Sequence, residues 1–196
     1  METGNYALRI SAAVLIAFSL AGCEGTSDTS ATVQKHTPEA ADGVLAGVSP
    51  RAVTVQAFSM KRGVGVLPGR IGERTTVGNV SMGYVTISPP PEVLFTDAIR
   101  SEISAAGHSV SGGPSTVSGT VQRFALSTPA TALYWDVTID AALSVNVNGT
   151  QRNYSDVCVT RTAAWPSDSL ISKVANECVS RITAKFRKDR SIANAL

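Results

Sequence analysis

Three cysteines and two histidines are the residues of this chain that are best suited to chemistry. His36 and His108 are too few for a zinc site, and neither has the neighbouring groups that a histidine base requires. Asp136 and Asp140 would share one face of a strand, where two carboxylates could act as a catalytic pair. A solvated strand face explains them more simply. We therefore expect no enzymatic activity, no cofactor and no metal.

Cys23 stands directly after an apolar run that extends over residues 10–20. This run is shorter than the roughly 20 residues that cross a bilayer, and it has the length of the apolar part of a secretory signal. The end of the run, Leu20-Ala21-Gly22-Cys23, resembles a bacterial lipobox. The resemblance implies that residues 1–22 are a cleaved signal peptide and that Cys23 carries the lipid, with a palmitate-like chain on its amine. An ordinary signal peptide with a chance cysteine is the alternative.

Such a lipid would anchor the protein stably to a membrane, because two or more acyl chains bind a bilayer firmly. The chain itself would not span the membrane. Glu24 follows the cysteine where aspartate would signal retention at the inner membrane. The lipoprotein resemblance therefore implies the outer membrane of a Gram-negative bacterium, on its periplasmic side. A formal net charge of +2 does not suggest a nucleic-acid partner.

The composition changes near residue 50. Residues 23–49 are rich in Ser, Thr, Ala and Gly without an apolar period, which is typical of a flexible tether. We expect His36 to have no partner there. Residues 50–196 have the length of one domain.

Alternating apolar residues predict strands at 52–58, 80–87, 115–127 and 133–147, and the chain returns in another strand after Asn148-Gly149. Residues 59–79 look irregular, and Gly119 is expected at a bulge or a close approach. Apolar stripes predict helices over about 91–106 and 168–188. His108, after the first helix, is expected at the surface. The order is strand–strand–helix–strand–strand–strand–helix, which favours an α+β fold: a mostly antiparallel sheet of about 4–5 strands, with both helices on one face.

Cys158 and Cys178 would then lie at similar depth on a strand and a helix. Because the periplasm is oxidising, they are candidates for a disulfide, and two buried free thiols are the alternative. The outcome depends on the hairpin register. A two-residue loop pairs Val137 with Thr160, whereas a bulged three-residue loop pairs it with Val159. The bulged loop matches the apolar faces better, and the sequence leaves both open.

Two surfaces are candidates for binding. Aromatic residues at one end of the sheet could close the core or form an exposed anchor, and they are Tyr134, Trp135 and Trp165. The uncovered sheet face would carry polar residues, namely Thr138, Asp140, Ser144 and Asn146.

The order of these features resembles the YajG-type bacterial lipoproteins. The matching segments are the lipobox, "VTVQAF", "AIRSEISAAGHSV", "VSGTVQRF", "WDVTIDAALSVNVNG" and "NYS". A more distant resemblance is to the auxiliary lipoproteins of lipid-handling ABC transport systems. Neither family supplies catalytic residues. We expect a non-enzymatic envelope module that binds or scaffolds a protein partner, with a lipid-transport subunit as the alternative and an envelope hydrolase as a third, weaker hypothesis. The sequence does not predict the oligomeric state.

Overall fold

The computed structural model describes residues 27–38 and 43–196, so Cys23 and the predicted signal peptide lie outside the described residues. The strands are β1 (Thr29–Thr32), β2 (Val53–Val55), β3 (Ser59–Met60), β4 (Arg70–Thr75), β5 (Ser81–Ser88), β6 (Ser115–Ser127), β7 (Trp135–Val147) and β8 (Thr150–Thr162). The helices are the short 3-10 helix η1 (Val44–Gly47), α2 (Pro91–Ala105), α3 (Asp168–Arg187) and α4 (Arg190–Ala195).

All eight strands belong to one mixed sheet. Its order is β1-β5-β4-β6-β7-β8, and β2 and β3 also pair with β6. The pairs β4–β5, β6–β7 and β7–β8 are antiparallel, whereas β1 is parallel to β5 and β2, β3 and β4 are parallel to β6. The predicted α+β class and the two long helices are confirmed. The predicted number of 4–5 strands is too low, because several short strands carry too few apolar residues to produce an alternating pattern. The predicted antiparallel pairing holds for the long strands β6, β7 and β8 and for β4–β5, whereas the short strands add parallel pairs.

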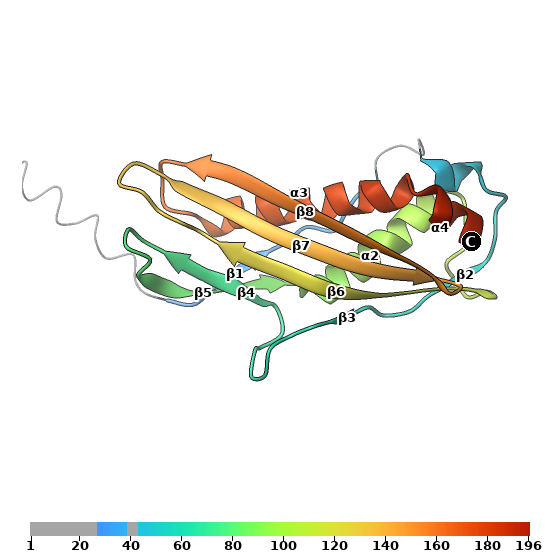
Figure 1. Cartoon of the computed structure of the whole chain (residues 1–196), viewed down its shortest axis with the longest axis horizontal. Coiled ribbons are helices and arrows are strands. Elements are labelled where there is room, and N and C mark those ends of the chain that lie inside the picture. Colours follow the sequence, from blue (N-terminus) through green and yellow to red (C-terminus); the bar gives the residue numbers. More distant parts are fainter. Residues whose placement is uncertain (1–26, 39–42) are drawn as a thin grey trace, which may run out of the picture.

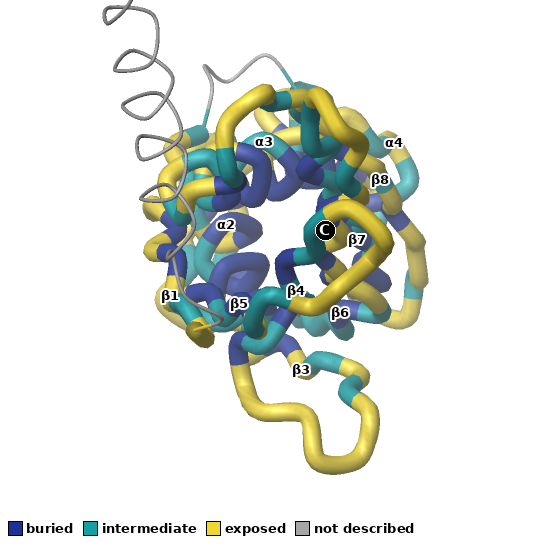
Figure 2. The backbone as a smooth tube through the Cα atoms, turned by 90° about the vertical axis from the view of Figure 1, so that its left-hand side faces the viewer, coloured by how far each residue is buried: buried dark blue, intermediate teal, exposed yellow. Residues whose placement is uncertain are grey.

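The segment from β2 to β4 runs along one edge of β6. Val53 pairs with Ser115, Ser59 with Thr120 and Gly72 with Leu126. Residues 59–79, predicted to be irregular, thus contain two strands. Between them, residues 61–69 leave the sheet as an exposed loop, which projects from the body in Figure 2.

The two long helices pack against the sheet as their apolar stripes predict. Phe95, Ala98, Ile99 and Ile103 of α2 are fully buried. In α3, the Ser167 side chain caps the first turn by accepting a hydrogen bond from the Leu170 N–H. Helix α3 contacts β8 and β7 on one side and β1 on the other, so it lies between the two edges of the curved sheet (Figure 2).

The β7–β8 hairpin closes with the two-residue turn Asn148-Gly149, in which both residues have positive φ. Val137 therefore pairs with Thr160 and Ile139 with Cys158. The alternative register, in which a bulged three-residue loop pairs Val137 with Val159, is therefore not the one observed. The consequence of the observed register is that Val157 and Val159 lie exposed on the outer face while Cys158 faces the core.

The predicted flexible tether is folded over the part of it that the structure describes. Thr29–Thr32 form β1, which pairs with residues 85–88 of β5. Ala31, Val33 and Leu45 are buried in the core. Short stretches of Ser, Thr and Ala can complete a sheet edge when only alternate residues face inward, and a periodicity search misses them.

Candidate functional site

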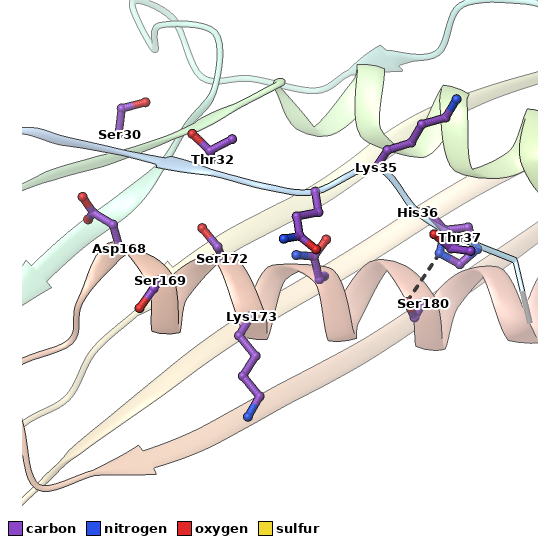
Figure 3. A pocket seen from close by; sticks show the side chains of 12 residues that line it. Ser30, Thr32, Lys35, His36, Thr37, Asp168, Ser169, Ser172, Lys173 and Ser180 are labelled. Atoms are coloured by element: carbon purple, nitrogen blue, oxygen red, sulfur yellow. Dashed lines mark hydrogen bonds between the residues drawn. The ribbon is translucent and has the colours of Figure 1, made fainter.

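A polar groove lies between β1 and α3, with a volume of about 810 Å³. Ser30, Thr32 and Gln34 line it from the N-terminal segment, and Ser172, Lys173 and Asn176 line it from α3 (Figure 3). The strand contributes alternate residues because their neighbours, such as Ala31 and Val33, point into the core. The walls therefore offer hydroxyl, amide and ammonium groups.

His36 lies at one end of the groove and fixes the N-terminal segment to both helices. Its Nε2 lies 2.7 Å from Oε1 of Glu102 in α2, and its Nδ1 lies 3.4 Å from Oγ of Ser180 in α3. Arg187 of α3 approaches the same carboxylate at 3.5 Å. His36 therefore has charged and polar partners, contrary to the expectation from the sequence, and these residues form a buried polar cluster.

His108 is also buried rather than at the surface. Its Nδ1 accepts a hydrogen bond from the Arg51 N–H at 3.2 Å, and its Nε2 lies 3.3 Å from the Leu45 carbonyl. Both contacts hold the chain before β2 against the end of α2. His108 is thus a structural residue and does not line the groove.

At one end of the groove, Ser180 Oγ lies 3.4 Å from His36 Nδ1, and His36 Nε2 lies 2.7 Å from Glu102 Oε1, so a hydroxyl, an imidazole and a carboxylate stand in one row. Asp168, at the start of α3, lies at the opposite end of the groove from His36 (Figure 3). Within residues 27–38 and 43–196, no group of three or more His, Cys, Asp or Glu side chains is placed to hold a metal ion. The hydroxyl, amide and imidazole groups that line the groove can form hydrogen bonds.

The two cysteines predicted as a pair form a disulfide between β8 and α3, with a Cα–Cα distance of 5.7 Å. Both residues are fully buried. The observed hairpin register makes this possible, because it turns Cys158 toward the helix.

The predicted aromatic residues meet where β7 begins and α3 starts. The Trp135 and Trp165 rings lie edge to face with centroids 5.8 Å apart. The Trp135 Nε1–H donates to the Thr75 carbonyl at 3.1 Å. The Arg161 guanidinium lies 3.8 Å from the centre of the Tyr134 ring. We call Tyr134, Trp135 and Trp165 the aromatic cluster; all three are partly exposed.

The guanidinium of Arg161 also pairs with Asp136, at 2.8 Å. The hydrogen bond from Arg161 lowers the pKa of the Asp136 carboxyl below its usual range. Asp136 is therefore held in its ionised form by a neighbour on β8, and this strand pairing explains its position.

The outer face of β7 carries the remaining predicted residues, Thr138, Asp140, Ser144 and Asn146. Asp140 pairs with Arg123 of β6 at 2.8 Å. Ser144 accepts a hydrogen bond from Gln151 at 3.0 Å. A shallow polar hollow of about 390 Å³ includes Ser144 and Asn146 but neither Thr138 nor Asp140. The face is therefore divided into an ion-paired part and a hollow.

No protein family model matches the chain, and no curated protein has a detectably similar sequence. A solved structure of a Xanthomonas campestris protein, assigned to family DUF330, is similar with a TM-score of 0.54 and 14% identity. The match covers 85% of this chain and 96% of that one. A second solved structure, of an uncharacterized protein, has a TM-score of 0.45 at 14% identity, over 81% of this chain and 98% of that one.

These comparisons define a fold shared with the DUF330 protein and no more. They do not show membership of the YajG-type lipoproteins, so that resemblance stays a prediction. Among the described residues, no helix is long and apolar enough to cross a membrane.

Proposed function

We propose that this chain is a non-enzymatic lipoprotein, anchored at Cys23 to the outer membrane and facing the periplasm, that binds an extended segment of an envelope protein. The observation that carries the proposal is the polar groove between β1 and α3. Its volume of about 810 Å³ falls within the range of binding pockets, about 300–1,000 Å³.

The strand beside the groove supports an extended ligand. Among the described strands, β1 is the last in the sheet order and pairs with β5 alone. The Val33 N–H donates to the Ser88 carbonyl on that side at 2.9 Å. Because backbone groups alternate along a strand, the N–H groups of Thr32 and Gln34 point to the other edge. A polypeptide that adds to a free edge gains main-chain hydrogen bonds there.

The side chains of the groove fit the same ligand. Gln34 and Asn176 carry amides, which can both donate to and accept from peptide groups. The residues that line the groove include no Phe, Tyr or Trp and carry only the small ring of His36, so the groove offers little of the stacking surface that a sugar or a nucleobase would use. The Lys35 and Lys173 side chains extend outward on either side of the groove (Figure 3), where their positive charges favour a segment that carries acidic side chains.

A photo-crosslinking amino acid at Lys173 tests this proposal in intact cells. We expect a crosslink to one envelope protein, and we expect the substitution Thr32→Trp, which fills the groove, to abolish it. The matched control places the crosslinker at Asn153, which is exposed on β8 outside the groove. Equal capture from both positions would contradict the assignment of the groove.

The identity of the captured protein decides between two forms of the function. A component of a lipid-transport system would make this chain an auxiliary subunit of that system. A structural envelope protein would make it a scaffold.

A further inference from the structure

One end of the molecule combines exposed apolar side chains with both tryptophans of the chain. The turn from β4 to β5 exposes Val77 at 55% and Val80 at 57%, and the loop from β6 to β7 exposes Leu133 at 79%. These loops lie at the end opposite the C-terminus in Figure 1. We call Val77, Val80 and Leu133, together with the aromatic cluster, the apolar end.

Hydrogen bonds hold the apolar end together as one surface. Thr75, directly before the β4–β5 turn, binds Thr128 of the β6–β7 loop through its N–H and its hydroxyl, both at 2.8 Å. The Thr75 carbonyl accepts the Trp135 indole N–H. The two loops and the tryptophans therefore keep fixed positions relative to one another.

The charges beside the cluster neutralise each other. Arg161 pairs with Asp136, and Arg74 pairs with Asp168. Aromatic rings next to apolar side chains, without a large net charge, are typical of protein surfaces at a membrane–water interface.

The described chain also begins at this end. A Cβ added to Gly83, near the start of β5, would lie 2.6 Å from the Ser27 carbonyl oxygen. Gly83 is three residues beyond Val80. Cys23 precedes Ser27 by four residues, which span at most about 14 Å. A lipid on Cys23 must therefore enter the bilayer close to the apolar end.

We propose that the apolar end docks on the bilayer that holds the lipid anchor. Val77, Val80 and Leu133 enter the interface, and the tryptophans lie at the level of the head groups. This proposal rests on the lipid anchor of the proposed function. It places the C-terminal end away from the membrane.

The two tryptophans are the natural probe, because both lie in the apolar end. The full lipidated protein is reconstituted into phosphatidylcholine vesicles with plain or brominated acyl chains. We expect brominated lipid to quench the tryptophan emission. We also expect similar quenching after anionic lipid is added, because apolar contact rather than charge holds the surface.

The double variant Val77→Asp and Leu133→Asp should lose the quenching, while flotation shows that the lipid still holds it on the vesicles. The matched control is Val64→Asp with Val66→Asp in the loop 61–69, whose side chains are also exposed. This control should keep the quenching.

Three results would overturn the docking: a wild-type protein that floats without quenching, a double variant that is still quenched, or a loop control that loses the quenching. A wild-type protein that fails to float would instead contradict the lipid anchor itself.

Discussion

Glu102 is a carboxylate with only 1% of its surface exposed, so its oxygens need hydrogen-bonding partners inside the protein. His36 supplies the shortest contact. We predict that His36→Ala lowers the free energy of unfolding by about 1–3 kcal/mol, because it leaves one carboxylate oxygen without its partner. Urea denaturation measures the change.

The control for His36 is its neighbour Lys35, which is exposed. Lys35→Ala should change the denaturation midpoint very little. If the two alanine variants unfold at the same urea concentration, the cluster does not stabilise the fold.

The buried hydroxyl of Tyr154 should make the stability of the fold depend on pH in the alkaline range. Its hydroxyl donates to Asp189 Oδ2 at 2.9 Å. Burial, and then the hydrogen bond to Asp189, raise the pKa of Tyr154 well above its ordinary value of about 10. Because the folded pKa is raised, this stabilisation is complete below about pH 10 and is lost as the pH rises further.

We therefore expect one tyrosine of the folded protein to ionise only with unfolding, as followed by phenolate absorbance during an alkaline titration. Tyr154→Phe should remove this delayed component. Its presence in the variant would assign it to another tyrosine.

At the scale of elements, the disulfide joins the edge strand β8 to α3 across a separation of 20 residues. A loop of that length predicts a stabilisation of about 3 kcal/mol. We expect the variant Cys158→Ala with Cys178→Ala to lose this amount in urea denaturation. The protein unfolded without reductant should show no thiol from this pair, and two reactive thiols would refute the bond.

Gly119 shows how closely β6 approaches the chain beside it. A Cβ at this position would lie 2.5 Å from the Phe58 ring, which confirms the close approach expected from the sequence. Gly119→Ala should destabilise the fold by about 1–3 kcal/mol, as overpacking does. Gly47→Ala is the control, because a Cβ there would meet nothing within 4 Å. Equal midpoints for the two variants in thermal unfolding would contradict this reason.

The elements that could be predicted from the sequence are those with a strong local pattern. Helix α3 has a long apolar stripe and a serine cap, and its observed bounds, Asp168–Arg187, match the expectation closely. β1 could not be predicted, because only its inward residues are apolar and they are small. The contact between His36 and Glu102 joins residues 66 positions apart and leaves no local signal. The groove could not be predicted either, because the N-terminal segment that forms one of its walls has the composition of a tether.

For the whole molecule, the folded unit begins by residue 27, and residues 27–38 belong to it. They cover one edge of β5 and place Val33 in the core, a burial worth about 2 kcal/mol. We predict that a chain starting at residue 50 is less stable in urea than one starting at residue 27, and that it associates in gel filtration through the uncovered edge. If the chain starting at residue 50 is monomeric and as stable as the longer one, the domain begins at residue 50, as predicted from the sequence.

The parallel pairing of β1 with β5 has a mechanical consequence for an anchored protein. A pull from the membrane enters at Ser27 and runs along β1, so the hydrogen bonds to residues 85–88 are loaded in shear rather than opened one after another. Shear spreads the force over the whole strand. With the proposed lipid on Cys23, β1 would therefore resist tension, and a force on the proposed partner would reach the lipid through this strand.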